Sequence, residues 1–118
     1  MAVYTRIHLS GSTSGRPIPV AATATPGTTI HTAVGGSTSF DEIYIRASNV
    51  TNAAVTLTVE WGGVTDPGDH LVKLYSIPAY SAPVTIASGE NLNGGLVVKA
   101  FCSVASAVNI VGFANRIS

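Results

Sequence analysis

The stretch NLNGGLVVKAFCSVASAVNIVGFANRI, residues Asn91 to Ile117, is the best candidate for the centre of the core. It contains two apolar runs, Leu96 to Cys102 and Ala107 to Ala114, which are joined by small residues. Residues in each run alternate with a period of two and many are β-branched, which is typical of short buried strands and not of a helix. The stretch therefore predicts two buried strands that pair as a hairpin.

Outward from this hairpin, short alternating runs separated by turn-forming residues cover the rest of the chain. The expected strands are Val3–Leu9, Thr28–Val34, Phe40–Ser48, Ala53–Trp61, Leu71–Ile77 and Val84–Ala87. Residues 88–90, Ser-Gly-Glu, are expected to form a turn. About eight short strands without a convincing helix predict an all-β fold, either an antiparallel β-sandwich or a small barrel.

Two neighbouring strands have clearly different inward and outward faces. In Phe40–Ser48 the residues Ile43, Ile45 and Ala47 share one face, and Ala53–Trp61 is expected to pair back onto this strand. The inward residues of that second strand are Val55, Leu57, Val59 and Trp61, and its outward residues are Thr56, Thr58 and Glu60.

The length of 118 residues indicates a single domain. Residues 41–118 are expected to form the core, and residues 1–40 to form an extended arm or peripheral strands. The segment Ile18–Thr25 is flanked and interrupted by prolines 17, 19 and 26. Because proline donates no hydrogen bond to a sheet, this segment is predicted to be an edge strand or an extended proline-rich N-terminal arm. In the arm interpretation, a chain without residues 1–26 still folds.

Charge is scarce and unevenly placed. Charged residues make up 10% of the chain, against about 25% in an average domain, and the net charge is zero. Such a surface is covered by small polar residues or by another protein, which favours a protein that assembles. The first 40 residues contain Arg6 and Arg16 but no acid, whereas all six acids lie in residues 41–90. This asymmetry either guides head-to-tail contacts between copies or is accidental.

The sequence offers little support for catalysis or metal binding. The densest polar cluster is Asp66, Asp69 and His70 in the stretch TDPGDH. Three ligands on one short turn are few for a metal site, and Asp-Pro-Gly-Asp suits a tight turn, so we expect a turn and no metal. A small hydrolase built on His70 with Asp66 or Asp69 is the enzymatic alternative. The Gly11–Gly15 segment has threonine at its centre and does not form a nucleophile elbow. We expect no enzymatic activity and no cofactor.

Several other sites and partners are also not expected. Cys102 is the single cysteine, so it forms no intrachain disulfide, and its apolar surroundings predict a buried thiol. Six scattered basic residues form no basic stripe, which argues against direct nucleic-acid binding. No apolar run approaches the roughly 20 residues of a membrane span, and the N-terminus does not resemble a signal peptide. We therefore expect no membrane partner.

Three stretches resemble segments of small virion structural proteins from tailed bacteriophages. They are RIHLSGSTSGRPIPVAATATPGTTIHTA (residues 6–33), IPAYSAPVTIASGENL (77–92) and LNGGLVVKAFCSVASAVNIVGFANRI (92–117). The resemblance covers most of the chain and implies a β-rich capsid decoration (cement) protein. It implies a homo-oligomer, with a trimer favoured, that binds the major capsid protein and stabilises the coat shell. It also implies a location on the capsid surface of the virion after assembly in the host bacterial cytoplasm, and it implies no cofactor or catalytic residue.

The resemblance names no interface, so the candidate contact residues come from the sequence itself. They are Tyr4, Arg6 and His8 at the chain start, Arg16, Pro17 and Pro19 in the proline-rich segment, and Tyr80 in the PAYSAP corner. Exposed backbone on the proline-rich arm, Arg16 to Pro26, is expected to accept a partner strand. The alternative function is a tail, neck or fibre module of a phage that forms rings or binds host glycans.

Overall fold

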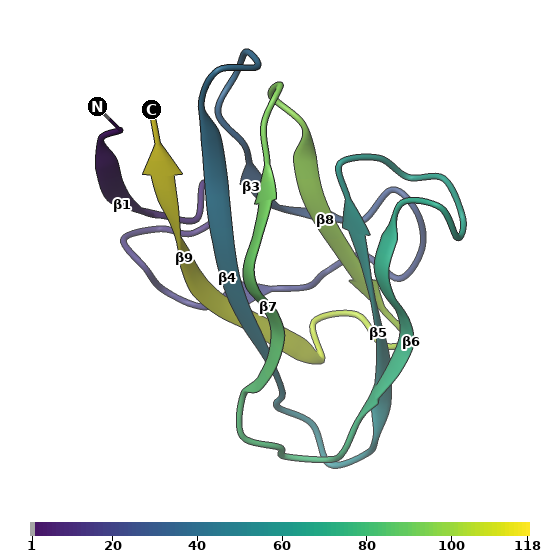
Figure 1. The fold of residues 1–118 in the computed structure, drawn as a ribbon. Helices are drawn as coiled ribbons and strands as arrows, with labels where there is room; N and C mark the ends of the chain where they lie inside the picture. Colours follow the sequence, from purple (N-terminus) through teal and green to yellow (C-terminus); the bar gives the residue numbers. More distant parts are fainter. Residues whose placement is uncertain (1) are drawn as a thin grey trace.

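The computed structural model describes residues 2–118, which form nine strands and no helix (Figure 1). The strands are β1 (Tyr4–His8), β2 (Ile18–Pro19), β3 (Thr28–Thr32), β4 (Phe40–Asn49), β5 (Val55–Trp61), β6 (His70–Ile77), β7 (Val84–Leu92), β8 (Val97–Cys102) and β9 (Val108–Ile117). The prediction of an all-β fold is confirmed.

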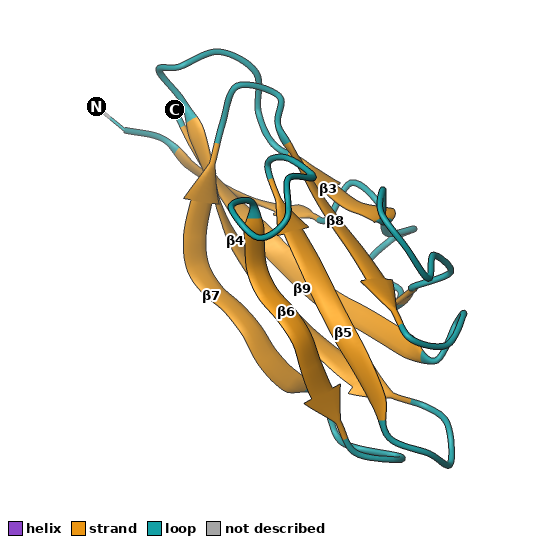
Figure 2. Cartoon of the chain, turned by 90° about the vertical axis from the view of Figure 1, so that its right-hand side faces the viewer, coloured by secondary structure: helices purple, strands orange, loops and turns teal. Residues whose placement is uncertain are grey.

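The strands form two antiparallel sheets that face each other across one core (Figure 2). Sheet A has the order β1-β9-β4-β7, with β2 also paired to β9, and sheet B has the order β3-β8-β5-β6. The core includes Ile43, Ile45 and Ile110 from sheet A and Leu57 and Val98 from sheet B, all fully buried. The arrangement is sandwich-like.

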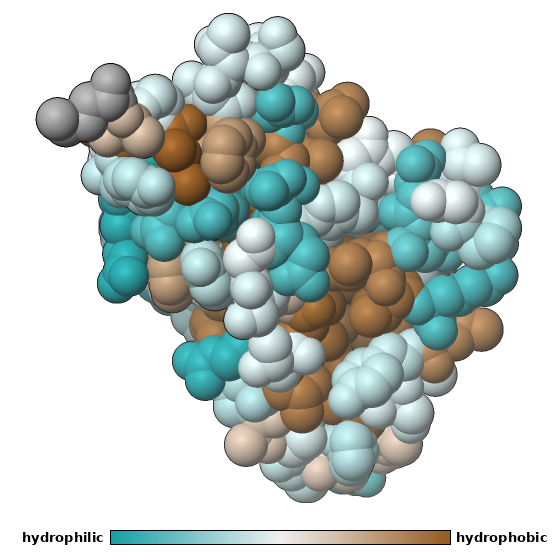
Figure 3. Space-filling view, viewed as in Figure 1, coloured by the Kyte–Doolittle hydropathy of each residue, from teal (hydrophilic) through white to brown (hydrophobic). Residues whose placement is uncertain are grey.

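The core is less completely covered along one side of the molecule. Between β7 and the β5–β6 pair, Figure 3 shows an apolar area on the surface. Leu71 and Val72 of β6, with Val84 and Ile86 of β7, are partly buried and pack against the core.

The predicted hairpin between the last two strands is wrong, because β8 and β9 belong to opposite sheets. β8 lies between β3 and β5, and β9 lies between β4 and the β1–β2 side of sheet A. Residues 103–107 carry the chain from one sheet to the other. The sequence pattern showed correctly that both strands are buried, but periodicity carries no information about which strand pairs with which.

The predicted pairing of β5 with β4 is wrong for the same reason. β4 pairs with β7 and β9, whereas β5 pairs with β6 and β8. The connection between the sheets is held by Asn49, whose side-chain amide donates to the carbonyls of Ala53 (2.8 Å) and Ile77 (3.1 Å). Its Oδ1 accepts from the Thr51 amide at 2.9 Å. These bonds stabilise an arch between the sheets instead of a hairpin turn.

The inward faces were predicted correctly, but the outward face of β5 was not. Val55, Leu57 and Val59 are buried as expected, whereas Trp61 is half-buried. Thr58 and Glu60, expected outside, are also buried. The Glu60 carboxylate accepts from the Thr25 hydroxyl (2.6 Å) and the Gly27 amide (2.8 Å). The β2–β3 loop therefore covers this part of sheet B, which strand periodicity cannot reveal.

The predicted turn at residues 88–90 is part of a continuous strand. β7 runs on to Leu92, and its pairing with β4 passes from Glu90 directly to Ser88, so Gly89 is an unpaired bulge residue. Gly89 has a φ of +102°, a conformation that glycine adopts without a steric penalty.

Part of the N-terminal region belongs to the core. Leu9, Ile18 and Val20 are buried, and the Val20 amide donates to the Val108 carbonyl at 2.9 Å. Ile18–Pro19 is a short strand on β9, which confirms the edge-strand alternative. An extended arm is not seen. The expectation that the chain folds without residues 1–26 stays a prediction, and the burial of these three side chains argues against it.

Candidate functional site

Six of the seven predicted interface residues lie along one edge of sheet A. β4 pairs with the whole of β9, so β1 and β2 both lie on the other side of β9. We call this the β1–β2 edge. Its exposed residues include Tyr4, Arg6, His8, Arg16, Pro17 and Pro19. Sequence reasoning selected these residues, and the fold brings them together.

The seventh predicted interface residue, Tyr80, lies elsewhere. It is in the β6–β7 loop, where its side chain is exposed. Its amide donates to the carbonyl of Thr51, in the arch that follows β4. Tyr4, by contrast, pairs with Ile117, which also pairs with Phe40 at the start of β4, so Tyr4 lies near the opposite end of that strand. Tyr80 is therefore not part of the β1–β2 edge.

The backbone of β1 has hydrogen-bonding groups that point away from sheet A. Val3 and Ser118 exchange two hydrogen bonds, of 2.8 and 3.0 Å, and the pairing of β1 with β9 continues from there without a shift. In an antiparallel pair, mutually bonded residues alternate with residues that direct N–H and C=O outward. Tyr4, Arg6 and His8 therefore present their backbone groups to the outside of the sheet.

The other sheet edges are protected in ways that β1 is not. The pairings of β6 and β7 with their neighbours are both interrupted by register shifts, and Leu74 in β6 has a φ of +53°. The free side of β3 is covered, because the Gly11 amide donates to the Ile30 carbonyl and Thr32 donates to Ser10 Oγ. Irregular or covered edges resist pairing with further strands. β1 is regular over its five residues and uncovered.

A row of packed side chains supports the β1–β2 edge from the outer face of sheet A. The guanidinium of Arg6 lies 4.3 Å from the centre of the Phe113 ring. Phe113 stacks on Tyr44 with ring centres 4.8 Å apart. The hydroxyl of Tyr44 lies close over Gly89, where a Cβ would come within 3.3 Å of it. The row spans β1, β9, β4 and β7, with Phe113 in contact with both Arg6 and Tyr44.

Two open hollows flank this edge. One, of about 430 Å³, is lined by Gly11, Thr13, Arg16, Pro17, Ile18 and Pro19. The other, of about 670 Å³, is lined by Arg6, Ile7, His8 and Phe113. Arg6 and Arg16 form no ion pair with any residue from 2 to 118. The edge therefore carries two arginines without an acidic partner in the described residues, and its residues line two hollows.

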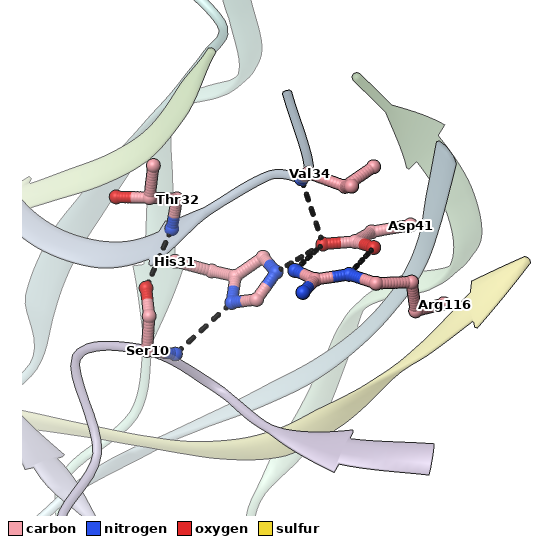
Figure 4. Close-up of polar contacts among 6 residues, drawn as sticks. All are labelled: Ser10, His31, Thr32, Val34, Asp41 and Arg116. Atoms are coloured by element: carbon pink, nitrogen blue, oxygen red, sulfur yellow. Dashed lines mark hydrogen bonds and ion pairs between the residues drawn. The ribbon is translucent and has the colours of Figure 1, made fainter. Parts of the chain in front are cut away.

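A buried polar network fixes the chain just after β1 (Figure 4). The Ser10 amide donates to Nδ1 of His31 at 3.0 Å, and Nε2 of His31 lies 2.7 Å from Asp41 Oδ2. Arg116 donates to both Asp41 oxygens at 2.8 and 2.9 Å, and the Val34 amide donates to Oδ2 at 3.2 Å. The side chains of His31 and Asp41 are fully buried. The network joins β3, β4 and β9 to the β1–β2 loop.

This network contains a serine, a histidine and an aspartate, but it lacks the geometry of a catalytic triad. The backbone amide of Ser10, not its hydroxyl, faces the imidazole of His31. The Ser10 hydroxyl oxygen instead accepts from the Thr32 amide at 2.6 Å. Nucleophilic catalysis requires the hydroxyl to reach the base. The arrangement anchors the loop.

The network predicts a specific loss of stability in acid. Burial by itself raises the pKa of Asp41, but hydrogen bonds from Arg116 and His31 and the charge of Arg116 outweigh it, so the pKa lies below its ordinary 3.8. A lowered pKa stabilises the fold above the unfolded-state value, and this contribution is lost as pH falls through the folded-state value. Urea unfolding from about pH 6 to about pH 2 should therefore show a decline below about pH 4 that is weaker in Asp41→Asn. Equal declines would contradict the assignment.

The predicted polar cluster lies in the β5–β6 loop and at the start of β6, and its three residues have different surroundings. Asp66 Oδ1 accepts from Lys73 Nζ at 2.7 Å, a hydrogen bond that lowers the Asp66 pKa. Asp69 Oδ2 accepts from the Thr65 amide at 3.0 Å, as the predicted turn requires. Nδ1 of His70 is buried and lies 3.6 Å from Asp66 Oδ1. Within residues 2–118, no three such side chains are placed to hold a metal ion.

Cys102 is buried as predicted, and its thiol lies 2.8 Å from the Val104 carbonyl. The described residues contain no helix that is long and apolar enough to cross a membrane. The chain matches no family model, no curated protein and no solved structure in the comparisons made with each.

Proposed function

We propose that this protein is a capsid decoration protein of a tailed bacteriophage, which binds the major capsid protein through its β1–β2 edge and stabilises the coat shell. One observation carries the proposal. β1 is a regular, uncovered edge strand whose Tyr4, Arg6 and His8 direct backbone groups outward. The resemblance of the sequence to small virion proteins supplies the biological setting.

The chemistry of the edge indicates the kind of partner segment. Outward N–H and C=O groups pair with any extended strand, and such strand addition gives affinity through the main chain. Specificity for one partner strand comes from the side chains beside β1. Arg6 and Arg16 are unpaired within the described chain, so the complementary strand carries acidic residues. We therefore assign the contact to an extended, acid-bearing segment of the major capsid protein.

If several copies bind the shell together, modest contacts from each copy are sufficient for stable binding. Once one copy in an oligomer has bound, the remaining contacts form at high effective concentration. We propose a homo-oligomer, with a trimer favoured, on the capsid surface of the virion, assembled in the host bacterial cytoplasm. This structural role uses no cofactor and no catalytic residue.

A proline at position 6 tests the strand-addition contact. The Arg6 amide points away from β9, so proline there leaves the pairing within sheet A intact and removes the central donor for a partner strand. Arg6→Ala removes the same charge and the contact with Phe113 but keeps the amide. We expect Arg6→Pro to bind capsids at least about tenfold more weakly than Arg6→Ala. Co-sedimentation with heads assembled without this protein measures the difference.

One further variant and one further measurement make this comparison decisive. Tyr80→Ala changes an exposed aromatic residue outside the β1–β2 edge and should bind like the unchanged protein. Thermal unfolding of each variant checks that the fold is retained. Equal binding by Arg6→Pro and Arg6→Ala would rule out strand addition at β1. Failure of the unchanged protein to bind any such head would rule out decoration itself.

A further inference from the structure

The Ser10 amide determines which nitrogen of His31 carries the proton. A backbone N–H can only donate, so Nδ1, which lies 3.0 Å from it, must be the unprotonated acceptor. The ring proton is therefore on Nε2, where it is donated to Asp41 Oδ2 across 2.7 Å. In this state the buried cluster holds one carboxylate, one guanidinium and a neutral imidazole, and its charges balance.

A second proton on His31 would disrupt this arrangement. Both ring nitrogens would then be donors, and Nδ1–H would face the Ser10 N–H, which would lose its acceptor. The cluster would also gain a net positive charge at His31, whose side chain is fully buried, although the Arg116 side chain beside it is partly exposed. Moving Ser10 away relieves both problems. That movement would also separate the Ser10 hydroxyl oxygen from the Thr32 amide, from which it accepts a hydrogen bond of 2.6 Å.

Among the described residues around His31, no further charged side chain would offset the positive charge of a protonated imidazole. β4 contributes Asp41 and β9 contributes Arg116, which already pair with each other through two bonds. β8 places the apolar Val98 opposite His31, and the β1–β2 loop contributes the Ser10 backbone. Asp41 would keep its bond to Nε2–H, so the contact that acid breaks is the one to Ser10.

We infer that His31 is an acid-sensitive latch on the β1–β2 edge. With a neutral imidazole the latch holds Ser10 in place, two residues beyond the end of β1. With a protonated imidazole, Ser10 loses its bonds to His31 and Thr32, which loosens the start of the segment between β1 and β2, while Gly11 stays bonded to the Ile30 carbonyl. This inference rests on the proposed function for its biological meaning, since the latch would regulate the docking edge. The loosening of the loop itself can be measured on the isolated protein, without any capsid.

Amide hydrogen exchange followed by NMR tests the latch on the unchanged protein. After correction for the intrinsic pH dependence of exchange, protection of the Ser10 amide should fall about tenfold or more between about pH 8 and about pH 5. The Val50 amide, which donates to the Ala107 carbonyl far from the network, is the internal control and should keep its protection. Carboxylates ordinarily titrate near pH 4, below this range, so they do not account for the change.

Two additional measurements assign the response to His31. Long-range proton–nitrogen correlation spectra at about pH 8 should show the His31 ring as the neutral Nε2–H tautomer. The chain has three histidines, so the double variant His8→Gln/His70→Gln leaves only His31 and should retain the pH response. Constant protection of Ser10, an Nδ1–H tautomer, or loss of the response in the double variant would each overturn the latch. None of these results bears on whether the protein binds capsids.

Discussion

Replacing Asp41 with alanine is expected to lower the free energy of unfolding by about 3–5 kcal/mol, because it leaves buried polar groups without a partner. Asp41 is fully buried and accepts hydrogen bonds from Arg116, His31 and the Val34 amide. The Arg116 side chain is partly exposed and can be solvated, so the loss comes mainly from the buried His31 ring and the Val34 amide, which lose their acceptor. Urea unfolding near neutral pH, compared with the unchanged protein, measures the loss.

Asp66 provides a matched control for this prediction. It is also paired with a basic residue, Lys73, but that pair is exposed to solvent. Exposed ion pairs contribute little to stability, so Asp66→Ala should change the unfolding midpoint much less than Asp41→Ala. If the two variants unfolded at the same urea concentration, the buried network would have no special role in the fold. Arg116→Met tests the same network from β9 and should also be strongly destabilising.

Gly112→Ala is expected to be the most harmful single-methyl change in sheet A, with a loss of about 3 kcal/mol in the free energy of unfolding. A Cβ at Gly112 would overlap the carbonyl oxygen of Tyr44 on the neighbouring strand and would also crowd the Ile45 backbone. Backbone atoms cannot rotate away as a side chain does. The pairing of β9 with β4 would therefore have to separate at the middle of the sheet.

Gly35→Ala is the matched control for this substitution. A Cβ at Gly35 would have no atom within 4 Å, and Gly35 is not among the glycines with positive φ. The same added methyl should therefore leave the thermal midpoint of unfolding nearly unchanged or slightly raised. A similar loss of stability in both variants would mean that glycine flexibility, and not the close approach of β4 and β9, explains the effect.

The strands were largely predictable from the sequence, but their partners were not. Alternation placed Ile43, Ile45 and Val59 correctly in the core, because a period of two reports which residues share a face. It could not show that β8 and β9 lie in opposite sheets, since pairing depends on contacts between segments far apart in the chain. The burial of Glu60 was missed for a related reason: its partners Thr25 and Gly27 belong to a loop that crosses from elsewhere.

The candidate site was predictable in part. Tyr4, Arg6 and Arg16 were recognisable as exposed residues in an acid-free segment, but their alignment on one edge follows from β4 occupying the whole other side of β9. The latch could not be found from the sequence, because His31 is 10 residues from Asp41, which is 75 residues from Arg116. The one available signal was a histidine placed beside Ile30 in a β-branched strand, which suggests a buried imidazole without naming its partner.

The pairing of distant strands has a consequence for how the chain reaches its native state. Among the strands of residues 2–118, β5 and β6 are the one pair that is also consecutive in sequence, whereas β1 joins β9 and β3 joins β8. Proteins dominated by such non-local pairings fold slowly, on the order of milliseconds to seconds. During synthesis, β1, β4 and β7 leave the ribosome before β9, so sheet A cannot close until the last strand is made. Ribosome-bound chains that end before Val108 should therefore lack the pairings of β9 with β1 and β4, which leaves one side of β4 exposed to chaperones or to other nascent chains.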